Sequence, residues 1–576
     1  MRTRILALFL CLSALATTMP AVAQAPPEDL LLVGGRIRTM DPARPWAEAV
    51  LISQGRIARV GSDAEVVAAA PKGATVIRLD GKLVLPGFID CHTHFLQGGY
   101  ALSSIQLKDV RSRQEFAARF AAKVAAIEKG AWILNGTWDE ERIDPPTLPA
   151  KEWIDRETPE NPVFVRRYDL HIGLANSVAL RMAGITKDTP SPAGGEILKD
   201  PSTGEPTGIL KESAMNLVTA LIPPPSLKDN VQAIEAALAH AAECGVTSVH
   251  EMAFPDEFTP AFEAYQVLYR AGKLTSRIYL YIPIPRIDLL TGLKMRSPFG
   301  NDFLRIAGLK AFCDGGLGAR TAVFYEPYTD DPGNTGIVHP QMTPEGVMEK
   351  RILEADRDGI QVAVHAIGDK ANDLILDIFE KAIAVNGPGE RRWRIEHAQH
   401  LRPEDIPRFG KLGVIASVQP YHAIDDGRWA EKRIGKDRAR TTYPFKSLLD
   451  GGAKLALGSD WMVAPLDPLS GIYAAVTRAT IDGKNPGGWY PEQKLTLEQA
   501  LRGYTLDAAY AEFSEKEKGS IEAGKMADLV VLDQDLFAIS PERIQDVQVA
   551  MTVAGGKVIY RRPAGGARQA EGRTAR

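Results

Sequence analysis

The stretch Leu85-Pro86-Gly87-Phe88-Ile89-Asp90-Cys91-His92-Thr93-His94-Phe95 decides how this chain is interpreted. An apolar run leads through Pro-Gly into a short hydrophobic strand that ends in His-x-His. Because residues two apart on a strand point to the same side, His92 and His94 present both imidazoles to one point. Two neutral imidazoles suit a divalent ion of the zinc type. A bare His-x-His also fits ordinary hydrogen bonding at a strand end, so the rest of the chain has to decide.

The composition is that of an ordinary globular protein. The chain has 576 residues, of which 45% are hydrophobic and 24% charged, and its formal net charge is −4. This length is enough to bury a large core. The weakly acidic balance gives no reason to expect nucleic acid or an anionic membrane as a partner. We expect a small-molecule ligand instead.

Residues 1–23 have the pattern of a secretory signal peptide. A basic start precedes the apolar segment 5–15, and Ala21-Val22-Ala23 is a small-x-small cleavage site. The segment is too short for a stable membrane span. We predict cleavage after Ala23, with cleavage after Ala25 or an uncleaved anchor as alternatives. The mature protein is then exported and soluble, and periplasmic in a Gram-negative source.

Three cysteines remain once Cys11 leaves with the signal peptide, namely Cys91, Cys244 and Cys313. An odd number with irregular spacing is unlike a disulfide framework. A large exported protein does not need disulfides, so we predict buried free thiols.

Both ends of the mature chain are rich in short strands and turns. Residues 24–84 and 511–562 predict one composite β-sandwich closed by the two termini. Within it, Gly34-Gly35 and Gln54-Gly55 are interpreted as hairpin turns. The tail 563–576 is rich in Arg, Gly and Ala, and we predict that it is disordered.

The α/β middle, residues 85–510, alternates strands with amphipathic helices. After the first strand we predict strands at Val246–His250, Arg277–Ile282, Leu304–Phe312, Gln361–Ile367, Arg394–Ala398, Val414–Gln419 and Lys454–Gly458. Eight strands is the number that closes a (β/α)8 barrel of the TIM type. A doubly wound open sheet is the alternative, but no Gly-rich dinucleotide turn supports it.

The long interval after the first strand breaks this rhythm. A crossover of this length is far beyond the usual one. We interpret residues 100–226, with their tryptophans and Pro-rich joints, as an insertion that lies over the barrel mouth.

Ligand-type side chains stand where the predicted strands end. Strands four, five, six and eight deliver Lys310, His365, His397 and Asp460. Active sites of such barrels lie at the carboxyl ends of the strands. Each residue alone is ordinary, but together with His92 and His94 they predict a metal site on one rim.

The order His-x-His, Lys, His, His, Asp resembles the amidohydrolase superfamily of metal-dependent hydrolases. Longer phrases resemble its YtcJ-like branch, which includes N-substituted formamide deformylase. These phrases are Leu85–His94, Asp169-Leu170-His171, Gly204–Leu210, Lys310–Ala322, His365–Asp369, Arg394–Ala398, Gly458–Asp460 and Gly519–Asp528. The similarity covers essentially the whole mature chain, with Leu170 in place of a small residue.

The resemblance implies two divalent metal ions. We expect zinc, and the ligand types also fit manganese or iron. His92, His94 and Asp460 would hold the buried ion, and His365 with His397 the exposed one. An ammonium has no acceptor, so Lys310 would bridge the ions as a carboxylated lysine. The alternative is a charged Lys310 paired with Asp314 or another acid, and a single metal. A homodimer is also plausible from the resemblance.

The resemblance further implies hydrolysis of a non-peptide C–N bond, of amide or formamide type, by a metal-bridging hydroxide. Asp460 would act as general base and then as general acid. His171, in the insertion, is a second catalytic candidate that would bind the substrate carbonyl, and a purely structural role is equally open. His250 is expected to lie outside the ligand set, and Tyr421-His422 is a candidate pocket wall.

Three other functions compete with this one. A mononuclear deaminase of the superfamily would carry His-x-x-Glu, whereas Ala366-Ile367-Gly368 follow His365. A lactonase or phosphotriesterase uses nearly the same ligands. If any of the six metal-ligating residues were absent from the sequence, a non-catalytic periplasmic binding protein would be favoured, but all six are present. The side chains that select the substrate lie in loops and in the insertion, and residue spacing there does not indicate which substrate is bound.

Overall fold

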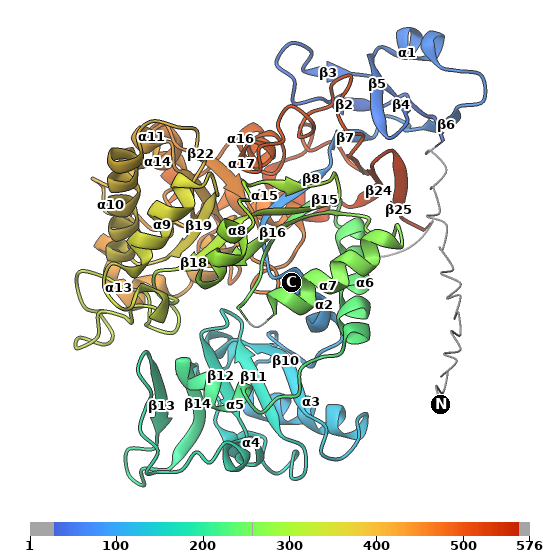
Figure 1. Ribbon diagram of the computed structural model, residues 1–576. Helices are drawn as coiled ribbons and strands as arrows, with labels where there is room; N and C mark the ends of the chain where they lie inside the picture. The colour runs from blue at the N-terminus through green and yellow to red at the C-terminus, as the bar shows by residue number, and fades with distance from the viewer. Residues whose placement is uncertain (1–27, 256, 564–576) are drawn as a thin grey trace, which may run out of the picture.

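The computed structural model describes residues 28–255 and 257–563. It has three parts, which Figure 1 shows as a β-sandwich at one end, a barrel in the middle and a separate α/β unit at the other end. The predicted signal peptide and the predicted disordered tail beyond residue 563 lie outside the described residues.

The barrel is a nearly closed ring of eight parallel strands. In sheet order these are β22 (Lys454–Leu457), β21 (Ile415–Val418), β20 (Arg394–His397), β19 (Val362–Ala366), β18 (Leu304–Phe312), β16 (Arg277–Pro283), β15 (Val246–Met252) and β8 (Phe88–Thr93). At the seam between β22 and β8, Thr93 and Trp461 form a parallel bridge. The ring confirms the predicted barrel and excludes the open sheet.

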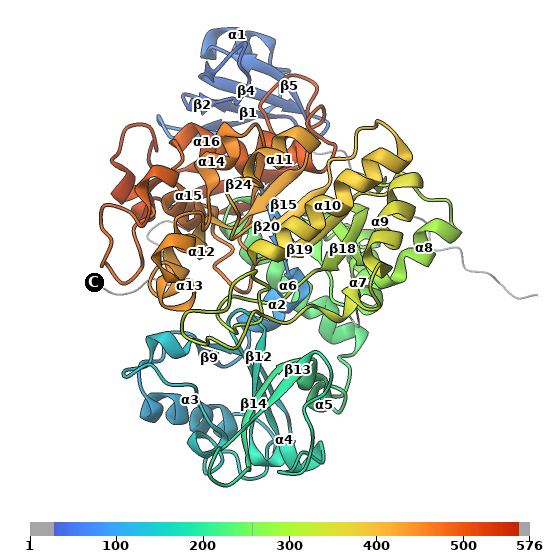
Figure 2. The same cartoon turned by 90° about the vertical axis from the view of Figure 1, so that its left-hand side faces the viewer.

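Helices cover the outside of the ring, as Figure 2 shows for α9 and α10 beside β18 and β19. The main ones are α6 (Leu227–Glu243), α7 (Phe258–Arg270), α8 (Ile287–Gly292), α9 (Val347–Arg357), α10 (Asp369–Asn386), α11 (Ile406–Leu412), α14 (Phe445–Asp450), α15 (Pro468–Thr477), α16 (Leu497–Gly503) and α17 (Leu506–Ala511). The start of α6 is a capping box, in which Ser226 and Asp229 each bond the other's backbone N–H. Its buried alanines recur every fourth residue, which gives one apolar face toward the barrel.

The composite sandwich is built from both chain ends, as predicted. One sheet has the order β5 (Arg56–Gly61), β4 (Ala49–Ser53), β1 (Leu30–Val33) and β6 (Thr75–Arg78). The other has the order β25 (Lys557–Arg561), β24 (Val549–Ala554), β23 (Leu529–Leu532), β7 (Leu83–Pro86), β2 (Arg36–Arg38) and β3 (Trp46–Ala47). Leu32 and Val50 from the first sheet pack with Val84 and Val531 from the second.

Two local predictions for this domain were wrong. Gly34-Gly35 is not a hairpin turn, because β1 and β2 belong to different sheets and the glycines carry the chain from one to the other. The segment expected to hold only strands and turns also contains α1 (Asp63–Ala69), which starts with a capping box between Ser62 and Glu65. The turn at Gln54-Gly55 is confirmed, since β4 and β5 pair antiparallel.

The insertion begins beyond α2 (Phe95–Leu102) and has its own six-stranded sheet. The sheet order is β13 (Gly195–Lys199), β14 (Pro206–Glu212), β12 (Ile172–Ala175), β11 (Val163–Arg167), β10 (Ile133–Trp138) and β9 (Gln106–Leu107), with helices α3 (Arg113–Ala125), α4 (Ser177–Met182) and α5 (Asn216–Thr219). It is fastened to the barrel by an ion pair of 2.9 Å between Asp139 and Arg428 and by the Tyr168 hydroxyl, which donates to Asp426 over 3.2 Å.

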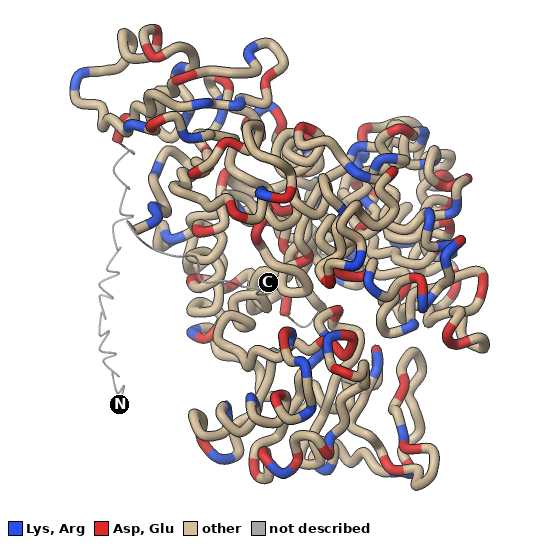
Figure 3. Tube along the Cα trace, turned by 180° about the vertical axis from the view of Figure 1, so that it is seen from behind, with Lys and Arg blue, Asp and Glu red and all other residues tan. Residues whose placement is uncertain are grey.

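Cys91, Cys244 and Cys313 are free and buried, which confirms the thiol prediction. Basic and acidic residues are intermixed over all three parts of the molecule (Figure 3). Within residues 28–255 and 257–563, the helices are too short or too polar to cross a bilayer.

Candidate metal centre

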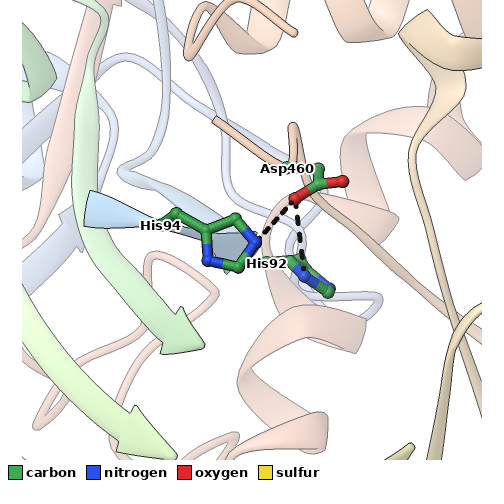
Figure 4. Close-up of side chains that lie close together, drawn as sticks. All are labelled: His92, His94 and Asp460. Atoms are coloured by element: carbon green, nitrogen blue, oxygen red, sulfur yellow. Dashed lines mark ion pairs between the residues drawn. The ribbon is translucent and has the colours of Figure 1, made fainter. Parts of the chain in front are cut away.

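His92 and His94 meet Asp460 across the seam of the barrel. The Nε2 atoms of His92 and His94 lie 3.5 and 3.3 Å from Oδ1 of Asp460 (Figure 4). The backbone N–H of Asp460 donates to the His92 carbonyl over 2.7 Å, which fixes the end of strand eight against strand one. The ring of His94 also stacks on Phe254 at 4.4 Å between centroids.

Several polar atoms at this point lack a hydrogen-bond partner among the described residues. His92 Nε2, His94 Nδ1 and Asp460 Oδ1 are buried without a hydrogen bond to any described residue. Each such atom costs about 1–3 kcal/mol when desolvated and unpaired. His92, His94 and Asp460 each offer a ligand atom within 4.8 Å of the others. Two imidazoles and a carboxylate are ligands that zinc accepts, so the residues present fit a divalent ion.

A second group shares Asp460. His397, at the end of β20, and His422, on α12 (Pro420–Asp426), offer ligand atoms within 4.8 Å of one another and of the Asp460 carboxylate. His422 Nε2 lies 4.0 Å from Asp460 Oδ2. From the sequence, His422 is expected only as part of a pocket wall. It lies one helical turn past the end of β21, so the strand-end rule extended by one turn would have found it.

His365, at the end of β19, lies beside His397 with 4.5 Å between ring centroids. Its Nε2 is 3.2 Å from the carbonyl of Gly315. Burial lowers the pKa of His365, His397 and His92 well below the ordinary value. All three are therefore neutral, which is the form of imidazole that binds metal.

Lys310 lies on β18, with its side chain wholly buried. Burial lowers the pKa of Lys310 to about 8, although the charges of Glu396 and Asp460 oppose the shift. Its Nζ has no hydrogen-bond partner in the described part of the chain and lies 4.7 Å from the centre of the Phe312 ring. Asp314 is occupied otherwise, since its carboxylate accepts the backbone N–H groups of Val323, Ile367 and Gly368.

The insertion brings His171 to the same rim. The His171 and His365 rings lie 5.7 Å apart, and Nδ1 of His171 is 3.0 Å from Oε1 of Glu212. Burial opposes protonation, but the charge and hydrogen bond of Glu212 raise the pKa of His171 to about 9. Thr321, in the loop after β18, donates its hydroxyl to the same Glu212 oxygen over 2.5 Å.

Glycines in that loop leave room for this contact. A Cβ on Gly316 would lie 2.7 Å from Cδ2 of His171, and one on Gly315 would lie 2.5 Å from Oε1 of Glu212. The close approach of the insertion to the barrel therefore depends on these two positions having no side chain.

Backbone strain gathers at the site. His397, Asp460 and Glu212 have φ values of 74°, 60° and 47°, in the left-handed region that residues other than glycine seldom adopt. Leu170, next to His171, has φ 68°. Such strain costs of order 1–3 kcal/mol per residue and persists where the surroundings over-determine it, commonly at functional sites.

His250 has both ring nitrogens engaged away from this rim. Nε2 lies 2.9 Å from Glu512, and Nδ1 lies 2.6 Å from a guanidinium nitrogen of Arg394. It therefore has no ring nitrogen left for a metal, as expected from the sequence.

The chain matches the model of a family described as Amidohydrolase family over residues 75–560. It belongs to that family. Across 92% of its length this amidohydrolase is 40% identical to Protein LONG AFTER FAR-RED 3 of Arabidopsis thaliana, covering 91% of that protein. Over 92% of its length it is 32% identical to the putative amidohydrolase YtcJ of Bacillus subtilis, covering 98% of it.

It is also 30% identical to the N-substituted formamide deformylase of Arthrobacter pascens, over 93% of this chain and 98% of that enzyme. A crystal structure of an uncharacterized metal-dependent hydrolase from Pyrococcus horikoshii OT3 superposes with a TM-score of 0.73 at 29% identity, covering 89% of this chain and 99% of that one. These likenesses confirm the resemblance found in the sequence. The protein is thus a metal-dependent hydrolase of the amidohydrolase superfamily, and these likenesses support action on a carbon–nitrogen bond.

Proposed function

We propose that this amidohydrolase cleaves a small amide of formamide or N-acyl amine type. The observation that carries the proposal is the position of Asp460, whose carboxylate belongs to both ligand groups at the barrel mouth. The likeness to an N-substituted formamide deformylase over nearly the whole chain favours a carbonyl attached to nitrogen as the scissile group.

His92, His94 and Asp460 would hold one divalent ion, and His397 with His365 or His422 the other. When bound, such ions supply an activated water near neutral pH and polarise the substrate carbonyl. Zinc fits the imidazole-rich set best. Both groups are largely buried, so the site also keeps bulk water from competing with the substrate.

We propose that Lys310 is carboxylated in the active enzyme. Its pKa of about 8 leaves part of the side chain as neutral amine at pH 7 to 8. The amine nitrogen adds to carbon dioxide and releases one proton, which yields a carbamate anion. That change turns a group with donors only into one with two acceptor oxygens, at a buried position where Nζ lacks a partner among the described side chains.

Asp460 would move the proton. Burial raises its pKa, but the adjacent imidazoles of His92 and His94 outweigh burial and hold the pKa well below the ordinary value, so the carboxylate is ionised. Oδ2, on the side of His422, is the oxygen that would accept a proton from the attacking water and return it to the departing amine.

His171 would bind the substrate carbonyl. With Nδ1 held by Glu212, the Nε2–H of a protonated ring is the donor left for an oxyanion. Its pKa of about 9 keeps the ring cationic at neutral pH, and the ring lies 5.7 Å from that of His365.

The test is a paired substrate assay on the mature enzyme with zinc and bicarbonate. Small N-formyl and N-acetyl amines are compared with the matching formate and acetate esters, and the released amine or alcohol is measured. Amide turnover that disappears with 1,10-phenanthroline but not with its non-chelating 1,7 isomer is expected. Turnover of esters alone, or amide turnover untouched by metal removal, would overturn the proposal.

A further inference from the structure

A carboxylate stands behind the metal centre, on the side of His92 away from Asp460. Arg394 and Glu396 lie two residues apart on β20 and are both fully buried in the barrel. Arg394 donates Nε–H to Oε1 of Glu396 over 2.8 Å and Nη2–H to Oε2 over 3.1 Å. This two-pronged pairing holds the carboxylate in one orientation.

Arg394 itself is fixed by neighbours from other strands. Its Nη1 is 2.6 Å from Nδ1 of His250 and donates to the Tyr281 hydroxyl over 2.9 Å, and its Nη2 donates to Ser417 over 2.8 Å. His250 is held in turn by Glu512, which is paired with Lys518 at 2.6 Å. A chain of buried polar contacts therefore runs from Lys518 to Glu396 inside the barrel.

The Glu396 carboxylate also contacts His92, the first residue of the candidate metal centre. Oε2 of Glu396 lies 2.6 Å from Nδ1 of His92. A carboxylate paired with a guanidinium only accepts hydrogen bonds, so Nδ1 of His92 must carry the proton. In a neutral ring the lone pair is then on Nε2, the atom that faces Asp460 and has no hydrogen-bond partner in the structure described.

We propose that Glu396 is a positioning residue that fixes the tautomer and ring orientation of His92, so that its Nε2 is presented to the divalent ion. Arg394 holds the Glu396 carboxylate in place, and the His250–Glu512–Lys518 contacts hold Arg394. The inference rests on the proposed metal site. Partners of this kind, behind a ligand histidine, typically contribute 10- to 100-fold to metal affinity.

Glu396→Gln tests the role with little change in shape. The amide has one acceptor oxygen in place of two, so it cannot make both the Oε1 and the Oε2 contacts, and an oxygen kept toward His92 leaves the NH2 against the Nε–H of Arg394. If its NH2 faces His92, Nδ1 has to accept and the proton moves to Nε2, where the ion would bind. Asp528→Asn is the matched control, because it alters a buried carboxylate that accepts two hydrogen bonds from one guanidinium, that of Arg277, without touching His92 or Arg394.

The measurement is the zinc affinity of metal-free full-length enzyme, by competition with a chelating dye, alongside thermal unfolding of the same metal-free samples. Zinc affinity is expected to fall 10- to 100-fold in Glu396→Gln and to stay close to the wild type in Asp528→Asn. Equal affinity in Glu396→Gln and wild type, or an equal fall in both variants, would overturn the inference. A wild type that binds no zinc would instead refute the metal site itself.

A second measurement is made on the wild type and covers the case in which Glu396→Gln does not fold. Nitrogen-15 NMR of histidine-labelled, metal-free wild type reports which ring nitrogen carries the proton. A protonated Nδ1 and an unprotonated Nε2 are expected for His92, assigned by loss of its signals in His92→Gln. A proton on Nε2 would contradict the role of Glu396.

Discussion

Asp460 donates its backbone N–H to the carbonyl of His92 over 2.7 Å, although one residue follows the last barrel strand and the other belongs to the first. This contact brings the carboxylate that follows strand eight onto the imidazoles of strand one, so closure of the barrel also assembles the candidate metal site.

Replacing Asp460 by Asn keeps the volume and removes the base. We expect kcat to fall by about 10²–10⁴, the range for loss of a general acid–base group, with the fold retained. Amine release and thermal unfolding should be measured on the same sample. Asp41→Asn, at an exposed turn of the sandwich, is a control that should leave kcat unchanged. Near wild-type turnover in Asp460→Asn would contradict its assignment.

The His171–Glu212 pair predicts a pH-dependent contribution to stability. The folded pKa of His171, about 9, is above its ordinary value of 6.5. The stabilisation by Glu212 is therefore fully present below pH 6.5 and is lost as pH rises through 9. Denaturant unfolding of wild type and Glu212→Gln from pH 6 to 10 should show a free-energy difference that shrinks over this window. A difference that is constant or grows with pH would contradict the pairing.

Gly316→Ala tests the position of His171 without altering any proposed ligand. The added Cβ would lie 2.7 Å from the His171 ring and displace it. A displacement of about 1 Å can cost up to 10²-fold, so we expect kcat to fall by 10-fold or more while metal content is unchanged. Gly292→Ala is the control, because a Cβ there meets nothing within 4 Å. Equal kcat in both variants would show that His171 takes no part in the reaction.

We also propose that the enzyme is exported. Expression of the full chain in a Gram-negative host should yield a periplasmic protein whose first residue is Gln24, by intact mass and N-terminal sequencing. A cytoplasmic protein that retains residues 1–23 would show this proposal to be wrong.

Much of the site could be predicted because strand ends obey simple rules. The period of two places His92 and His94 on one side, and parallel strands bring Lys310, His365, His397 and Asp460 to one rim whatever the loops do. The eight strands followed from the same hydrophobic pattern, and each was found within a few residues of its observed bounds.

What could not be predicted depends on contacts between distant elements. The pairing of His171 with Glu212 and its fit against Gly316 arise only when the insertion docks on the barrel. Glu396 belongs to a buried strand, where sequence gives no sign of which side chain it meets. Strand β1 does not form the expected hairpin with β2. It pairs with β4 and β6 instead, and this pairing is set by the tertiary fold.

The metal content of untagged enzyme, purified with zinc and bicarbonate, tests the two-metal centre most directly. We predict two zinc ions per chain in the wild type, and fewer than two in Lys310→Met, which has no amine to carboxylate. One ion per chain in both proteins would mean that Lys310 bridges nothing. No bound ion, even after reconstitution, would contradict the metal centre altogether.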